Sequence, residues 1–80
     1  MNSELTAASY TAGLIVAEYL DAKKMHPTGM RSAHEGYAII LEELDELWDE
    51  VKKKQPDREK MVKEAKQVAA MALRFMLEIG

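Results

Sequence analysis

The chain has 80 residues, a formal net charge of −3, no cysteine and 48% hydrophobic residues. The negative charge excludes the overall basic field on which non-specific nucleic-acid binding depends. The lack of cysteine excludes disulfides and thiolate metal sites. Because a chain this short gains little stability from one core, its high apolar content predicts burial of a further face in a homodimer or homotetramer.

Neither a membrane span nor a signal peptide is indicated. The longest apolar run, Thr11–Ala17, is far shorter than the ~20 residues that a membrane span requires. The first ten residues, MNSELTAASY, lack the basic start of a signal peptide. We therefore expect a soluble cytoplasmic protein that consists of one domain over residues 1–80.

A first helix is predicted over about Ser3–Met25, where apolar residues recur every three or four positions. Asn2 or Ser3 can cap it, and the segment His26-Pro27-Thr28-Gly29 ends it because proline and glycine disfavour helix. Gly13 costs about 1 kcal/mol relative to alanine inside a helix. Its presence predicts a close contact between this helix and another element.

A second helix is predicted from about Ser32 to Lys53, and Ser32 and Glu35 have the spacing of a capping box. Apolar residues gather on one side of it and acidic residues on the other, at about 100° per residue. Tyr37 and Trp48 belong to the apolar side and are expected in the core or in an interface. The apolar positions are Tyr37, Ile40, Leu41, Leu44, Leu47, Trp48 and Val51; the acidic ones are Glu35, Glu42, Glu43, Glu46, Asp49 and Glu50.

A third helix is predicted from about Asp57 to Ile79, with Pro56 at its first position and Gly80 as its C-terminal cap. Its apolar side is broad. Three arginines, Arg31, Arg58 and Arg74, are expected at the surface. The predicted fold class is all-α: a leading helix plus an antiparallel helical hairpin, completing a four-helix-type bundle by oligomerisation.

The carboxylates of the second helix repel one another, since like charges three or four residues apart cost roughly 0.2–0.5 kcal/mol per pair. An antiparallel hairpin brings Glu43 and Glu46 level with Glu64 and Gln67 of the third helix. Oxygen ligands without sulfur or imidazole suit Mg²⁺ or Mn²⁺, which would convert the repulsion into coordination. A solvated acidic helix face is the simpler alternative.

The segments HEGYAIILEELDELWDEV and KEAKQVAAMALRF resemble the MazG-like members of the all-α nucleoside triphosphate pyrophosphohydrolases. That superfamily carries EExxE on one helix and ExxD on the next. Here the first motif matches Glu42–Glu46, and Glu64 follows after 17 intervening residues. The resemblance covers about Met30–Ile79. One position departs from it, because Gln67 stands where the family has aspartate, and an amide supplies neither charge nor a base.

The resemblance implies a Mg²⁺-dependent (or Mn²⁺-dependent) enzyme that hydrolyses a nucleoside or deoxynucleoside triphosphate to the monophosphate and pyrophosphate, as nucleotide-pool house-cleaning. Its metal ligands would be Glu43, Glu46, Glu64 and Gln67, and Glu42 or Glu46 would act as the base. The three lysines of the turn would attract the phosphates: Lys52, Lys53 and Lys54.

Two alternatives come from other classes of protein. One is a non-catalytic helical oligomerisation or interaction module that retains the fold. The other is a metal-binding or partner-binding helical domain of a larger assembly. Catalysis predicts that Glu46→Gln removes turnover and leaves the fold intact, whereas a scaffold predicts that the same change is neutral or stabilising because it relieves repulsion.

Overall fold

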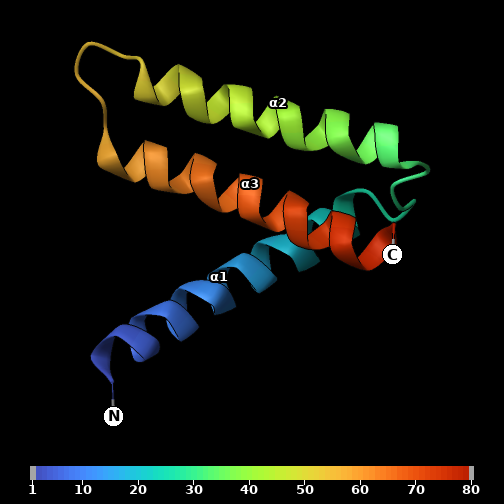
Figure 1. Ribbon diagram of the computed structural model, residues 1–80, viewed down its shortest axis with the longest axis horizontal. Helices are drawn as coiled ribbons and strands as arrows, with labels where there is room; N and C mark the ends of the chain where they lie inside the picture. Colours follow the sequence, from blue (N-terminus) through green and yellow to red (C-terminus); the bar gives the residue numbers. More distant parts are fainter. Residues whose placement is uncertain (1, 80) are drawn as a thin grey trace.

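The computed structural model describes residues 2–79 and contains three helices. They are α1 (Ser3–Met25), α2 (Ala33–Val51) and α3 (Arg58–Glu78). α2 and α3 form an antiparallel hairpin, and α1 packs on α3 at an angle, on the side away from α2 (Figure 1). No strand occurs in this part of the chain, so the all-α class and the order of a leading helix followed by a hairpin are confirmed. None of the three helices is long and apolar enough to cross a bilayer.

Side-chain caps fix where each helix begins. Asn2 Oδ1 accepts a hydrogen bond from the backbone N–H of Glu4 at 2.8 Å, which confirms Asn2 as the first cap. Asp57 Oδ1 accepts from the N–H of Glu59 at 2.9 Å, so Asp57 caps α3. Pro56 therefore precedes the cap, and its predicted place as the first helical residue is wrong. The predicted cap Gly80 lies outside the described residues.

Only half of the predicted capping box forms at the start of α2. Ser32 Oγ accepts from the N–H of Glu35 at 3.1 Å, as the box requires. The Glu35 carboxylate reaches one residue further back and accepts from the Arg31 N–H at 3.1 Å and from its Nε at 2.9 Å. These hydrogen bonds tie the connecting loop to the first turn of α2.

α2 packs on α3 along one edge of its apolar side. Gly36 is buried at this edge, where a Cβ atom would lie 2.5 Å from the Phe75 ring. The half-buried positions of α2 that follow along it are Ile39, Ile40, Glu43, Leu47 and Glu50. The rest of the apolar side stays in solvent, and Tyr37 and Trp48 are 65% and 58% exposed. Neither belongs to a core of the isolated chain, which leaves an interface as the place where they would be buried.

A buried ion pair near the C-terminal end of α3 also holds the loop that follows α1. Arg74 is only 4% exposed, and its Nε donates to Glu78 at 3.0 Å. Arg74 Nη2 also donates to the Thr28 carbonyl at 3.1 Å, while Glu78 accepts from the Met30 N–H at 2.7 Å. Arg74 therefore does not lie at the surface as expected. It fastens the loop after α1 to α3.

Gly13 makes no close contact. A Cβ atom built there would meet nothing within 4 Å, so the predicted approach of another element at this position is wrong within the chain. The open space follows from the angle of α1, whose N-terminal half diverges from α3 (Figure 1).

We predict that Gly36→Ala lowers the free energy of unfolding by about 1–3 kcal/mol, because the added methyl group must displace the Phe75 ring and the Met30 sulfur. Urea denaturation followed by circular dichroism measures the change. Gly13→Ala is the matched control and should raise the stability by up to about 1 kcal/mol, since its Cβ enters open space inside a helix. Equal effects of the two changes would contradict the close packing at Gly36.

Replacing the buried arginine tests the ion pair. Arg74→Met should destabilise the chain by about 3 kcal/mol, because it leaves the Glu78 carboxylate with only the more distant Lys23 ammonium, 3.8 Å away, as its cation. The control is Arg31→Met, which removes an arginine whose side chain is 78% exposed, and little loss is expected there. The same denaturation experiment compares both with the unchanged protein.

Candidate metal site

Three carboxylates from two helices meet beside the hairpin. One oxygen each of Glu43, Glu46 and Glu64 lies within 4.8 Å of the other two. Glu43 and Glu46 are one turn apart on α2, and Glu64 comes from the facing turn of α3. The antiparallel alignment that the sequence predicted is thereby confirmed at these three positions.

The cluster forms because Glu43 lies on the edge of α2 that packs on α3. Glu43 and Glu64 are half-buried, whereas Glu46 is exposed. A half-buried carboxylate loses hydration, and its neighbours here carry the same charge. The site therefore has an energetic reason to take up a proton or a cation.

The pKa values of two carboxyl groups show this effect. Burial, a hydrogen bond with Glu46 and the nearby negative charges raise the pKa of Glu43 to about 7. Burial and the charge of Glu46 likewise raise the pKa of Glu64 above its ordinary value. Burial is the larger cause of both shifts and the crowding of acids adds to it, while the charge of Lys63 opposes the shift of Glu64 only in part. Partly buried, crowded carboxylates are an arrangement that favours a divalent cation.

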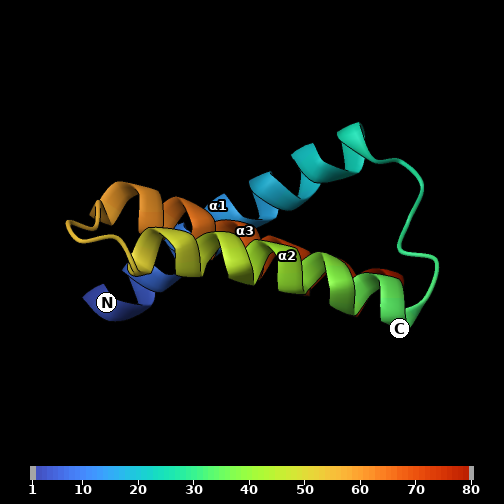
Figure 2. The same ribbon diagram turned by 90° about the horizontal axis from the view of Figure 1, so that it is seen from above.

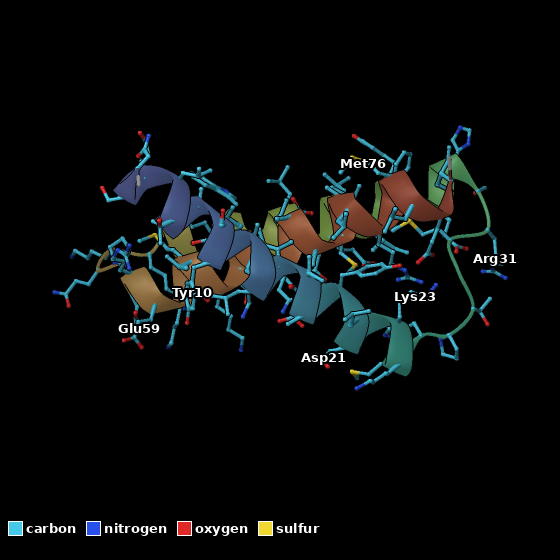
Figure 3. The ribbon with its side chains drawn as sticks, turned by 90° about the horizontal axis from the view of Figure 1, so that it is seen from below. Tyr10, Asp21, Lys23, Arg31, Glu59 and Met76 are labelled. Carbon is cyan, nitrogen blue, oxygen red and sulfur yellow. The ribbon has the colours of Figure 1, made fainter. Side chains whose placement is uncertain are left out.

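A cavity of about 820 Å³ adjoins the cluster. The C-terminal half of α1, the following loop, α2 and α3 all contribute to its wall. Figure 3 labels Asp21 on that half of α1 and Arg31 on the loop, and both line the cavity. Acidic side chains line it on the α1 and α2 sides, and arginines line it at the loop end: Arg31 and Arg74.

Of the three clustered carboxylates, only Glu43 lines this cavity, and two further residues predicted for the site line it as well. Glu42 is exposed at its wall, next to Glu43. Gln67 is half-buried and lies on α3, one turn beyond Glu64. Glu35 also lines the cavity, but its carboxylate accepts hydrogen bonds from Arg31. These hydrogen bonds lower the pKa of Glu35.

The three lysines predicted to bind phosphates lie elsewhere. Lys52 Nζ is 3.1 Å from Asp49, and Lys53 Nζ is 2.8 Å from Glu50. Both pairs belong to the end of α2 and the turn, and none of the three lysines lines the cavity. Within one chain they are separate from the cavity, because the end of α2 lies more than a turn beyond Glu46.

Two acidic residues of α1 were not foreseen. Glu18 and Asp21 line the cavity opposite α2 and α3, and Glu18 is also 3.7 Å from Lys66 Nζ. Their spacing of three puts both on one face of α1, which is a signal that the sequence contains. What the sequence does not contain is the angle at which α1 crosses α3, and only that angle turns this face toward the cavity.

No family model matches the chain, and neither curated proteins nor solved structures gave a match.

The metal-free chain should lose stability as the pH rises from about 5 to 8. The folded state holds the Glu43 proton up to about pH 7, whereas the ordinary pKa of 4.5 applies after unfolding. Ionisation above 4.5 therefore favours the unfolded chain, and the whole loss is reached above about pH 7. Urea denaturation in EDTA at about pH 5 and at about pH 8 measures this loss in the free energy of unfolding.

Glu43→Gln should flatten this pH dependence because the amide does not titrate. Asp45→Asn is the control, since Asp45 is exposed on the same helix and lies outside the cluster. The control should keep the slope of the unchanged protein. A slope that Glu43→Gln leaves intact would mean that other groups cause it.

Proposed function

We propose that the chain is a MazG-like nucleotide pyrophosphohydrolase that uses Mg²⁺ or Mn²⁺ to convert a nucleoside or deoxynucleoside triphosphate into the monophosphate and pyrophosphate. The observation that carries the proposal is the convergence of Glu43, Glu46 and Glu64 beside a cavity of about 820 Å³. The proposed reaction is the one that the resemblance of the two helical segments to this superfamily implies. The cytoplasm, where nucleotide pools are kept, is the proposed location.

The donor set fits a hard divalent cation. Glu43, Glu46 and Glu64 offer carboxylate oxygens only, and Mg²⁺ binds such ligands together with substrate phosphates and water. When bound, the cation would neutralise phosphate oxygens and lower the pKa of a bound water. Without it, the same cluster would repel a triphosphate.

The remaining residues have separate roles in the proposal. Glu42, exposed at the cavity wall, would accept the proton of the attacking water. The cavity is within the usual range for small-molecule sites, roughly 300–1,000 Å³, and would hold the nucleoside. Lys52, Lys53 and Lys54 would attract phosphates from a neighbouring chain, since they lie away from their own cavity.

Gln67 removes one negative charge from the pattern of the superfamily. Its amide oxygen can still ligate Mg²⁺. Glu18 and Asp21 bring carboxylates to the same cavity from α1. The cavity therefore keeps a strongly acidic wall, which supports a cation-dependent function despite the replaced aspartate.

The competing proposal is a helical module that keeps the fold without catalysis. It is favoured by the exposed apolar side of α2, because a partner that covered these side chains would stabilise the chain whether or not it is an enzyme. Both proposals include a homodimer or homotetramer that completes a four-helix bundle. They differ in the role of Glu46, which is a metal ligand or base in the enzyme and has no catalytic role in the module.

Pyrophosphate release from a panel of ribo- and deoxyribonucleoside triphosphates, with and without Mg²⁺ or Mn²⁺, tests the enzyme. We expect metal-dependent release that falls at least about 100-fold in Glu46→Gln, because a ligand or base is lost. Asp45→Asn, one residue away and exposed, should retain the activity. Circular dichroism confirms that each variant is folded.

The stability of the same proteins separates the two proposals. A cation at 100 times its Kd raises the stability of the folded state by about 2.7 kcal/mol. Mg²⁺ should therefore raise the melting temperature of the unchanged protein and not that of Glu46→Gln. Stability that is insensitive to Mg²⁺, no release from any triphosphate, and a Glu46→Gln variant of equal or greater stability would together establish the scaffold.

A further inference from the structure

The cavity lies between two helices that do not contact each other. α1 and α2 both pack on α3, but no Cα atom of α1 lies within 8 Å of one in α2. Gln67, Met71 and Arg74 line the cavity from α3 at steps of four and three residues, so one face of α3 forms its floor. Seen from above, the C-terminal half of α1 diverges from α2, and residues 26–32 connect the two helices at one end (Figure 2). A ligand in the cavity would therefore meet α1 on one side and α2 on the other.

The two guanidinium groups at the loop end of the cavity are already paired. Arg31 Nε donates to the Glu35 carboxylate at 2.9 Å, and Arg31 Nη2 lies 2.8 Å from the same group. Arg74 donates to Glu78 and to the Thr28 carbonyl. Both positive charges are thus balanced within the chain. This end of the cavity does not offer the free cation that a phosphate group would require.

The α1 wall of the cavity instead offers hydrogen-bond acceptors. Glu18 is half-buried, and its Oε1 lies 3.7 Å from Lys66 Nζ, which is beyond hydrogen-bond distance. Asp21 is exposed one turn further along the same face of α1 (Figure 3). An ionised carboxylate can only accept hydrogen bonds. A ligand that contacts this wall must therefore supply the N–H or O–H donors.

The cavity wall also carries apolar side chains from all three helices. Ala22 and Met25 line it from α1, Ile39 from α2 and Met71 from α3. Met71 is buried, so its contribution is part of the packed floor. Apolar walls with a few polar groups that fix orientation are typical of sites for small organic molecules. A flat heterocyclic ring with N–H groups on its edge matches both the apolar and the acceptor parts of this wall.

We propose that the cavity selects nucleotides whose base carries an amino group where uracil and hypoxanthine carry an oxo group, as cytosine and adenine do. The two N–H groups of that amino group would donate to Glu18 and Asp21 of α1. An oxo group at the same place would set an acceptor of the base against the acceptors of the protein. The inference rests on the proposed pyrophosphohydrolase function and names its substrate class.

The charges of the two walls determine which way the nucleotide lies. The carboxylates of α1 repel phosphate groups. The cation proposed at the carboxylate cluster attracts them, and Glu43 of that cluster lines the cavity from α2. The phosphates would therefore lie toward α2 and the base toward α1. This orientation brings the amino group of the base to the wall that holds the free acceptors.

Nucleotides that differ in a single group test the selection. With Mg²⁺, we expect kcat/KM for pyrophosphate release to be at least about tenfold higher for cytidine than for uridine triphosphate, and for adenosine than for inosine triphosphate. A factor of this size is typical where carboxylates accept hydrogen bonds from an amino group of one base and face an oxo group of the other. A ratio below about threefold in either pair would overturn the proposal.

A double variant, Glu18→Gln with Asp21→Asn, tests the role of α1. Amides both donate and accept hydrogen bonds, so both ratios should fall below about threefold as the oxo bases become acceptable. Glu4→Gln is the matched control and should keep the ratios, since Glu4 is an exposed acid of α1 that does not line the cavity. Circular dichroism confirms folding, and Asp21→Asn alone replaces the double variant if that protein is unfolded. Ratios that the cavity variant leaves unchanged would overturn the assignment to α1.

Binding of nucleoside monophosphates separates this inference from the proposed function, because a monophosphate has no phosphoanhydride bond to cleave. Calorimetric titration with cytidine and uridine monophosphates in Mg²⁺ should give a Kd at least about tenfold lower for cytidine, and the difference should vanish in the cavity variant. That result would support the selection even if no triphosphate were hydrolysed. Hydrolysis of all triphosphates at equal rates would retain the enzyme and overturn the selection. No hydrolysis and no binding of either monophosphate would overturn both.

Discussion

The contact between Gly36 and Phe75 sets how α2 is turned about its own axis, and the other features follow from that rotation. A residue with a Cβ atom at position 36 would collide with the Phe75 ring, so glycine alone allows α2 to approach α3 along this edge. The same edge carries Glu43 one heptad further on. Helix packing therefore brings an acidic residue toward α3 and turns Tyr37 and Trp48 toward solvent.

The energetic consequences of this rotation lie on opposite sides of the hairpin. On one side, Glu43 and Glu64 are crowded beside Glu46, and their pKa values are raised first by burial and then by the neighbouring like charges. On the other side, large apolar side chains stay exposed, which costs free energy in water. A cation at the first and a second chain at the other would relieve both costs. In the single chain, both the carboxylate cluster and the exposed apolar side of α2 therefore raise the free energy of the folded state.

The loop after α1 connects these features to the cavity. Burial opposes ionisation of Glu78, yet hydrogen bonds from Met30 and Arg74 outweigh it and lower the pKa of Glu78. The charged pair fixes the loop on α3, and the loop forms the end wall of the cavity with Thr28 and Arg31. A polar interaction within the chain therefore determines the shape of the proposed binding site.

The sequence by itself determined the helices and their order, because caps and apolar periodicity are local: α1 was predicted at its observed bounds, Ser3–Met25. It also determined that Glu43 and Glu46 lie level with Glu64, since a short turn forces antiparallel alignment, and the rotation of α2 then brings the three carboxylates together. Only the tertiary structure decided which edge of α2 packs, that Arg74 is buried, and that Glu18 and Asp21 join the cavity. These depend on the rotation of α2 and the crossing angle of α1, which arise from side chains far apart in sequence. An apolar side wider than one partner helix can cover permits several such rotations, and the contact between Gly36 and Phe75 selects one of them.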